Sequence, residues 1–334
     1  MTSPMVRMMD YQNGVRLGYL LSELADLNVA DQVADGPLPV AEIADRVGAH
    51  PEMLHRALRA VASRGVFTEV APGVFGQTEM SETLRSDVDG SLRDVFRMQG
   101  MPFIRDVFAG IGHTVRTGEP AFDHVHGTDL PTYLAAHPDH ARLFAGAMGS
   151  AIGHVHQAAL DAHDLSSVRR LVDVGGADGR FLAAALTRHP RLTGVVFDVP
   201  AVVERAAKTL ADAGVADRAE LVGGDYFTAV PPGGDAYLLS HVVNQIPDPD
   251  AVRVLRTVCD AVAPDGRVIL VDPVLPDGDV PHPGKFMDIT AMALTRGRGR
   301  TEREIVALLA EAGLRHTATI ATAAPSSVVL AVPA

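Results

Sequence analysis

The chain has 334 residues, of which 47% are hydrophobic and 21% charged, a composition typical of a globular protein large enough for two domains. Its net charge of -12 repels phosphate backbones and anionic lipids, so we expect neither nucleic acid nor a membrane as a partner. A single cysteine, Cys259, excludes an intrachain disulfide framework. The first residues lack the apolar core of a signal peptide, and we therefore expect a cytoplasmic protein.

The front of the chain has the element order of a winged helix. Residues 15–34 place leucines at near-helical spacing and predict an amphipathic helix. Residues 37–78 predict a short helix, a turn, a second helix and a β-hairpin with Pro-Gly at its tip. Such a segment could bind DNA through Arg56, Arg59 and Arg64, or it could be a scaffold for dimerisation. The acidic chain favours dimerisation.

Residues 91–162 are predicted to be mostly helical, and their apolar faces are expected to bury against one another. Some large apolar side chains in this stretch are also candidates to line a substrate pocket. These candidates are Phe103, Phe108, Phe144 and Met148.

The back of the chain alternates strands with helices. Apolar strands are predicted at 170–174, 194–198, 218–222, 235–241 and 266–272, with helices at 179–189, 200–213 and 249–263. This alternation predicts an α/β fold, a parallel sheet with helices on both faces. Residues 301–316 predict another helix and 326–332 a last strand. The boundary is expected within 163–169, giving a domain of residues 1–162 and a second of residues 163–334.

A glycine cluster follows the first of these strands, in "LVDVGGADGRF" at 171–181. A phosphate-binding P-loop is poorly supported, because no lysine and Ser/Thr pair follows Gly179. The spacing of Gly175, Gly176 and Gly179 also fails the dinucleotide pattern. What remains is a strand, a tight turn and a helix N-terminus, whose backbone N–H groups suit a carboxylate as well as a phosphate.

Polar residues end the next two strands. Asp198, at the end of the second, can accept hydrogen bonds from both hydroxyls of a ribose. Asp225 and Tyr226 follow the third, where an acid can accept from an exocyclic amine and a ring can cover a purine. A carboxylate site, a ribose site and an adenine site on successive strands together describe S-adenosylmethionine.

The chain resembles the caffeate-type small-molecule O-methyltransferases and their bacterial natural-product relatives over nearly its whole length. The matching motifs include "LVDVGGADGRF", "FDVPAVVERA", "GGDYF" and "GRTEREIVALLAEAGL". The resemblance implies a Rossmann-like domain that binds S-adenosylmethionine, preceded by a mostly helical winged-helix domain that dimerises and roofs the substrate pocket. It implies methyl transfer to a small aromatic or heteroaromatic metabolite, with S-adenosylhomocysteine as product, in a homodimer.

The resemblance also implies site residues. The cofactor contacts would be Asp173, Gly175, Gly176, Asp198, Val199, Gly224, Asp225, Tyr226 and Ser240. Asp288 and Met292 stand where family members line the substrate pocket. Asp288 can equally be an acid at a helix N-terminus.

The resemblance breaks at the catalytic base. The family usually carries His-Asp-Trp after the fourth strand, and here the corresponding residues are Asn244, Gln245 and Ile246. Asp272 keeps one of the two acidic positions that hold the histidine, whereas Gly299 replaces the other. An amide cannot act as a base near neutral pH, so proton abstraction by this residue is excluded.

Several chemistries remain open. Positioning alone could drive methyl transfer, with Asn244 hydrogen-bonding the substrate and Asp272 behind it. The acceptor could be a heteroaromatic nitrogen or an acidified hydroxyl, which needs no base, or His154 could serve as one. His241 is interpreted as incidental. The alternatives are a non-methylating hydroxylase, decarboxylase or pericyclase and, from another class, a ligand-sensing winged-helix regulator. We expect no metal site.

Overall fold

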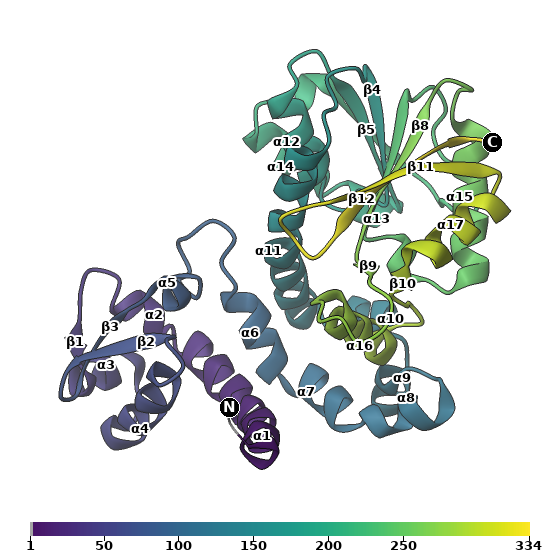
Figure 1. Cartoon of the computed structure of the whole chain (residues 1–334). Helices are drawn as coiled ribbons and strands as arrows, with labels where there is room; N and C mark the ends of the chain where they lie inside the picture. Colours follow the sequence, from purple (N-terminus) through teal and green to yellow (C-terminus); the bar gives the residue numbers. More distant parts are fainter. Residues whose placement is uncertain (1–2) are drawn as a thin grey trace. The chain divides into compact units, whose positions relative to one another are not determined.

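The computed structural model describes residues 3–334, except for the side chain of residue 151. The chain forms two units (Figure 1). The first holds the chain up to Gly110 together with Val125–Ile152. The second holds Ile111–His124 together with Gly153–Ala334.

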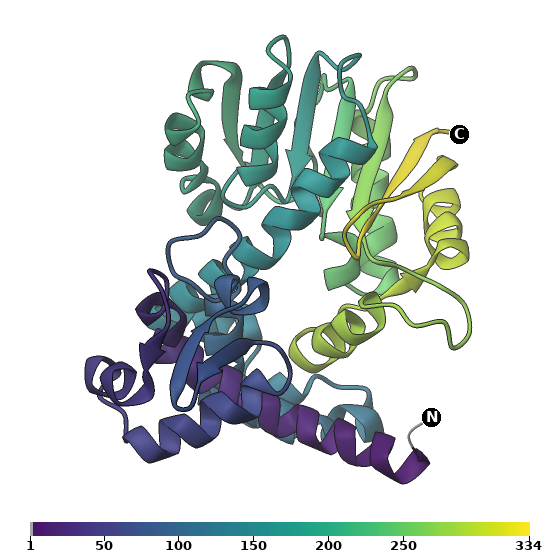
Figure 2. The ribbon, with the colours of Figure 1, turned by 60° about the vertical axis from the view of Figure 1, so that its left-hand side comes forward.

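The first unit begins with one long helix, α1 (Pro4–Asp26), which Figure 2 shows as a continuous rod. Ser3 caps its start by accepting the N–H of Val6, and Pro4 occupies the first helical position, where no N–H is needed. The predicted winged-helix order follows. Its elements are α2 (Val29–Gln32), β1 (Leu38–Pro39), α3 (Val40–Val47), α4 (Pro51–Ala62), β2 (Phe67–Ala71), β3 (Val74–Gln77) and α5 (Glu79–Glu82).

The three strands of the first unit pair antiparallel in the order β1-β3-β2. Leu58 of α4 and Ile43 of α3 are fully buried in one core cluster with Phe75 of β3, which explains the helical spacing of apolar residues in α3 and α4. The remaining helices of the unit are α6 (Arg93–Gly100), α7 (Pro102–Ala109), α10 (Leu130–Ala136) and the first part of α11 (Pro138–Ala162). Along α1, however, several large apolar side chains are exposed. They are Met5, Val6, Met8, Met9, Tyr11, Val15 and Tyr19.

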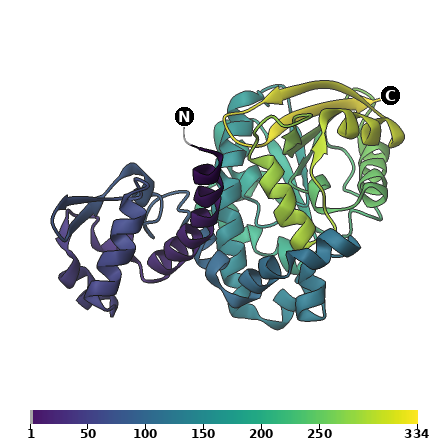
Figure 3. The ribbon, with the colours of Figure 1, turned by 60° about the horizontal axis from the view of Figure 1, so that its bottom comes forward.

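The second unit is built on a seven-stranded sheet with the order β11-β12-β8-β7-β4-β5-β6. The predicted strands are confirmed as β4 (Arg170–Val174), β5 (Thr193–Asp198), β6 (Ala219–Gly223), β7 (Ala236–Ser240), β8 (Arg267–Asp272) and β12 (Ser327–Pro333). β4 to β8 pair in parallel, as predicted, whereas β12 runs antiparallel to both of its neighbours. Figure 3 shows β11 and β12, in yellow, together at one edge.

Helices cover both faces of this sheet, as predicted (Figure 1). One core cluster joins the sheet to α12 (Arg180–Arg188), α14 (Ala206–Asp212) and the end of α11. The other joins it to α15 (Asp248–Ala261) and α17 (Glu302–Glu311). The predicted helix 200–213 is broken in two, α13 (Pro200–Val203) and α14. The remaining elements are α8 (Ile111–Thr117), α9 (Ala121–His126), η1 (Ala216–Arg218), η2 (Val243–Gln245), β9 (Val274–Leu275), α16 (Gly284–Leu294) and β10 (Arg300–Thr301).

The predicted helix 301–316 is wrong in its last part. The helix α17 ends at Glu311, and Gly313 then takes a φ of 83°, a left-handed conformation that ends helices. The chain continues as β11 (Leu314–Ala321), an edge strand paired with β12. The threonines and isoleucine of this stretch favour a strand once a neighbouring strand is available.

None of the helices within residues 3–334 is both long enough and apolar enough to cross a lipid bilayer.

Candidate active site

The carboxyl ends of the parallel strands meet at one edge of the sheet, where open α/β sheets bind their ligands. The glycine turn after β4 forms part of this edge. Gly175 has a φ of 72°, and its N–H donates to the carbonyl of Phe197 at the end of β5 at 2.8 Å. A Cβ at Gly175 would lie 2.7 Å from the side chain of Val242. Glycine is therefore required here, and the turn presents bare backbone.

Asp173 lies beneath this turn and is fully buried. Burial, followed by the nearby Asp198 and Asp178, raises the pKa of its carboxyl to about 7. Its Oδ2 has no hydrogen-bond partner in the described part of the chain. A Cβ at Gly176 would lie 2.9 Å from the carboxyl group, so the glycine leaves the space beside it open. A buried acid with a vacant acceptor suits a cationic group of a ligand.

Asp198 ends β5 beside the same turn. Its Oδ2 accepts the N–H of Ala177 at 2.9 Å, and its Oδ1 accepts the N–H of Val199 at 2.7 Å. Burial raises the pKa of this half-buried carboxyl. Each oxygen keeps a second lone pair for an outside donor. The Asp198 carbonyl accepts the N–H of Gly224 at 2.9 Å, which draws the end of β6 to the end of β5.

Tyr226 completes this group of residues. Desolvation, followed by the charges of Asp198, Asp225 and Asp250, raises the pKa of its phenol. The ring edge also lies 3.8 Å from the Cβ position of Gly175. Asp225 is exposed, and its Oδ1 accepts the N–H of Phe227 at 2.9 Å. The structure thus brings together the predicted turn, ribose and adenine residues.

Ser240 ends β7, and its Oγ is buried without a hydrogen-bond partner among residues 3–334. Together with Asp173 Oδ2 it gives two orphaned polar atoms at the ends of adjacent strands. Native proteins rarely leave such groups unpaired unless a ligand or water completes them. The residues present therefore fit S-adenosylmethionine, because its polar groups can pair with these two atoms. An apolar ligand would leave both atoms unpaired.

Asn244 lies in η2, between the ends of β7 and β8, and is 9% exposed. Its side-chain Nδ2 lies 3.4 Å from Nδ1 of His241, and its Oδ1 accepts from Nε2 of Gln245 at 3.3 Å. The backbone N–H of Asn244 donates to the carboxyl of Asp272. The structure thus brings together the predicted pair of Asn244 and Asp272.

Asp272 is fully buried at the end of β8. Burial raises the pKa of its carboxyl to about 8, although Arg300 and the N–H of Asn244 act in the opposite direction. Its Oδ1 has no hydrogen-bond partner in the described chain. With this pKa the carboxyl is mostly protonated at neutral pH. Asp272 can therefore donate a hydrogen bond, but it carries little negative charge.

Arg300 holds the Asn244 loop in place, a role that the sequence interpretation missed. The side chain is 2% exposed. Its guanidinium donates to the carbonyls of Val243 and Ile246 at 2.6 and 2.8 Å, and its Nε donates to Asp248 at 2.9 Å. In the sequence, the one feature that points to this role is that Arg300 follows Gly299 in the matched "GRTERE" motif.

The segment before Arg300 also packs against the site. A Cβ at Gly297 would lie 2.3 Å from the carbonyl oxygen of Asn244. The N–H of Gly299 donates to Asp288 Oδ1 at 2.5 Å, and a Cβ at Gly299 would lie 3.1 Å from the Asp288 carboxyl carbon. Asp288 therefore places a carboxylate beside Gly299, the position where the resemblance predicts the family's second acid.

The other predicted site residues lie on the helices α7, α11 and α16. His154 is exposed, and His156 stacks edge-on against Phe181 at 5.0 Å; burial lowers the pKa of His156 to about 3. In the first unit, Phe103 is buried and stacks on His140 at 4.4 Å. The remaining candidates are half-buried, and their roles stay predictions. They are Phe108, Phe144, Met148 and Met292.

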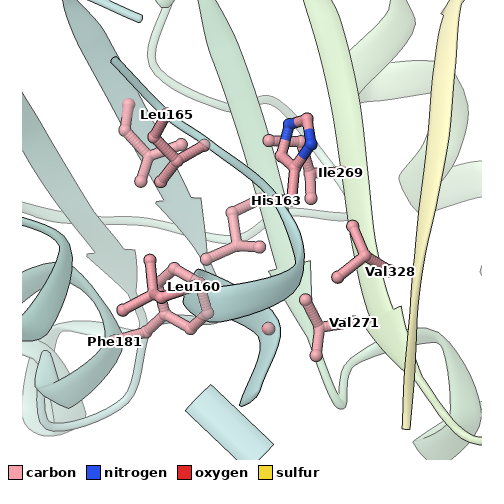
Figure 4. Close-up of a pocket in the computed structure, with 10 residues that line it drawn as sticks. Leu160, His163, Leu165, Phe181, Ile269, Val271 and Val328 are labelled. Atoms are coloured by element: carbon pink, nitrogen blue, oxygen red, sulfur yellow. The ribbon is translucent and has the colours of Figure 1, made fainter. Parts of the chain in front are cut away.

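A separate pocket in the second unit lies between the end of α11 and the sheet (Figure 4). Its lining is apolar apart from His163, whose buried Nε2 has no partner among the described residues. Leu160, Phe181 and Val328 are among the apolar residues that line it. The pocket offers none of the acceptors that S-adenosylmethionine needs, so the polar edge of the sheet is the candidate site.

Comparisons with known proteins show the family of this chain. The O-methyltransferase domain matches residues 108–315, and the O-methyltransferase dimerisation domain matches residues 9–87. The phenazine O-methyltransferase PhzM of Lysobacter antibioticus is 39% identical over 92% of this chain and 90% of its own. The solved structure of CalO1, a methyltransferase of calicheamicin biosynthesis with S-adenosylhomocysteine bound, matches with a TM-score of 0.90 and 30% identity over 100% of both chains.

A relative of different activity also matches. The aclacinomycin 10-hydroxylase RdmB of Streptomyces purpurascens is 32% identical over 87% of this chain and 79% of its own. It is less similar than the methyltransferase from Lysobacter, so the non-methylating alternative is not favoured. The chain belongs to the O-methyltransferase family and is a homodimeric methyltransferase whose cofactor is S-adenosylmethionine.

Proposed function

We propose that this enzyme methylates a hydroxyl or a nitrogen of a small aromatic or heteroaromatic metabolite, in the cytoplasm, without a general base. One observation supports the proposal: the polar residues at the carboxyl edge of the sheet lie beside Asn244, the position where the resemblance predicts a histidine. The relatives support the acceptor class, because one is named for a phenazine and another for calicheamicin biosynthesis.

The cofactor roles follow from the geometry of the edge. Asp198 would accept from the two ribose hydroxyls through the lone pairs left free by Ala177 and Val199. Asp173 and Ser240 would bind the amino-acid end, and Tyr226 would cover the adenine beside Asp225. When bound, the cofactor supplies an electrophilic methyl group on a sulfonium.

Acceptor activation would depend on orientation. Asn244 would hydrogen-bond the acceptor, while Arg300 and Asp272 hold its loop. Correct orientation of two reactants can contribute roughly 7–11 kcal/mol in well-aligned cases, more than the ~3–5 kcal/mol equivalent of a typical general base. A site without a base can therefore still accelerate transfer to an acceptor that loses its proton readily or has none.

This proposal predicts binding and product formation. Calorimetric titration should show binding of both S-adenosylmethionine and S-adenosylhomocysteine. A panel of hydroxylated and nitrogen-containing aromatic acceptors should yield a product heavier by one CH₂. Asn244→Ala should lower kcat/KM for the acceptor by about tenfold or more and leave cofactor affinity unchanged, because it removes one hydrogen bond to the acceptor.

Two results would contradict it. A product with added oxygen or lost CO₂ would place the enzyme with the non-methylating tailoring enzymes. Unchanged turnover and acceptor affinity in Asn244→Ala would remove this residue from the site.

The exposed apolar side chains of α1 predict where the two subunits meet. Tyr11 and Val15 are 66% and 58% exposed and lie within the matched dimerisation domain. Burying such side chains against a second copy stabilises a dimer by roughly 1.5–3 kcal/mol each. The double variant Tyr11→Asp, Val15→Asp should shift sedimentation velocity from dimer to monomer. Val280→Asp, at a 53% exposed position outside that domain, is the matched control and should stay dimeric.

A further inference from the structure

His241 is held in an unusual conformation beside Asn244. It follows the last residue of β7 and has a φ of 54°, in the left-handed region that side chains other than glycine rarely adopt. Its backbone N–H donates to the carbonyl of Val271 on β8 at 2.9 Å. Such strain persists only where the surrounding structure imposes it, and it concentrates at functional sites.

Both ring nitrogens of His241 have a partner. Nε2 lies 3.0 Å from the hydroxyl of Ser326, which is 1% exposed and precedes β12. Nδ1 lies 3.4 Å from Nδ2 of Asn244. Ser326, 85 residues from His241 in the sequence, thus joins it and Asn244 in one chain of hydrogen bonds, Ser326–His241–Asn244.

The amide NH₂ of Asn244 faces Nδ1 of His241. Because an amide NH₂ only donates, this orientation makes Nδ1 the acceptor and places the ring proton on Nε2, which can donate to the hydroxyl of Ser326. The amide oxygen of Asn244 then points away from His241, and among the described residues it accepts only from Gln245, an exposed side chain that can move aside. Burial lowers the pKa of His241 to about 4, so the ring stays neutral and Nδ1 keeps its lone pair at neutral pH.

We propose that His241 is a positioning residue that turns the amide oxygen of Asn244 toward the acceptor, so that the enzyme selects acceptors whose reacting atom carries a hydrogen. This inference rests on the proposed function and narrows its substrate class to phenols and N–H amines. A ring nitrogen without a hydrogen cannot donate to the amide oxygen, and the lone pairs of the two atoms would repel each other. In the reaction, the acceptor atom gains the methyl group as the carbon–sulfur bond breaks, and the acceptor proton leaves to water.

Two substitutions separate the two ends of the imidazole. Asn at position 241 places an oxygen near the position of Nδ1 and keeps an acceptor for Asn244. Gln at the same position places its amide near Nε2 and keeps the contact to Ser326 alone. His241→Asn and His241→Gln therefore change the same residue into two amides that preserve opposite halves of the chain.

His241→Gln should lower kcat/KM for a hydroxylated acceptor such as 2-naphthol by about tenfold, with cofactor affinity unchanged, whereas His241→Asn should stay within about threefold of the wild type. The wild type should methylate 2-naphthol and not isoquinoline, a matched ring with a bare nitrogen. His241→Gln should reduce this preference. Equal losses in the two variants, or a wild-type preference for isoquinoline, would overturn the inference.

A second readout needs no acceptor. ¹⁵N NMR of the imidazoles, with the His241 signal identified by its loss in His241→Asn, should show the proton on Nε2 and a lone pair on Nδ1. A proton on Nδ1 would mean that Asn244 turns its oxygen toward His241, and it would overturn the inference whether or not methyl transfer occurs. Absence of any methylated product, with the proton on Nε2, would instead count against the proposed function alone.

Discussion

Replacing Asp198 with alanine is expected to lower the affinity for S-adenosylmethionine by at least about a hundredfold, because two hydrogen bonds donated to a charged acceptor contribute about 1.5–3 kcal/mol each. The carboxylate is placed for this role by Ala177 and Val199, whose N–H groups it accepts at 2.9 and 2.7 Å. The substitution also leaves both N–H groups without their partner, so the glycine turn loses an anchor. Isothermal calorimetry measures the loss, and kcat/KM should fall with it.

Two further variants make the result specific. Asp198→Asn keeps one acceptor oxygen, so its affinity for S-adenosylmethionine should lie between those of the wild type and the alanine variant. Asp212→Ala removes an exposed acid of α14 that pairs with Lys208, and cofactor affinity should not change. If folded Asp198→Ala dimer binds S-adenosylmethionine as tightly as the wild type, Asp198 is not the ribose acceptor.

The cofactor edge could be predicted because its signals are local in sequence. Gly175 directly follows β4, Asp198 is the last residue of β5, and Asp225 stands two residues after β6; parallel strands bring their carboxyl ends to one edge. The positions of the parallel strands β4 to β8 were predicted to within about a residue, and most of these strands are buried, continuous apolar runs. The left-handed glycines of the turn confirm the reason for the cluster.

The acceptor side could not be predicted in the same way, because its contacts join distant segments. Arg300 donates to Val243, 57 residues away, and His241 contacts Ser326, 85 residues away. No periodicity or spacing links such pairs in a single sequence. The edge strand β11 was missed for a similar reason: its pairing with β12, a tertiary contact, outweighs the helical pattern that leads into it.

The second large effect concerns Arg300, whose replacement by methionine should lower the free energy of unfolding by about 3–5 kcal/mol, as expected when one partner of a buried charged group is removed. Methionine matches the aliphatic length but leaves the carbonyls of Val243 and Ile246 without their donor. It also removes the positive charge that favours ionisation of buried Asp272. Urea denaturation measures this decrease in the free energy of unfolding. Arg300→Lys keeps the positive charge but has fewer hydrogen-bond donors, so its free energy of unfolding should decrease less.

The companion variant Asp272→Asn separates charge from hydrogen bonding. The folded-state pKa of Asp272 is about 8, above its ordinary value of 3.8, so between these values the folded chain holds a proton that the unfolded chain has lost. The free energy of unfolding therefore does not depend on this group below about pH 4 and falls by ~1.4 kcal/mol per pH unit as the pH rises from there to about 8. Asp272→Asn should abolish this pH dependence, so the variant should become more stable relative to the wild type as the pH rises.

The two substitutions together test how Arg300 and Asp272 are coupled. If Arg300 mainly offsets the charge of Asp272, the double variant Arg300→Met, Asp272→Asn should regain at pH 8 much of the stability that Arg300→Met loses. It should regain little at pH 5, because the Asp272 carboxyl is then protonated in the folded state with or without Arg300. If Arg300 mainly ties the loop through Val243 and Ile246, the loss should persist at both pH values and acceptor kcat/KM should stay low. Equal stability of Arg300→Met and the wild type would contradict both roles, because the buried guanidinium would then contribute nothing to the fold.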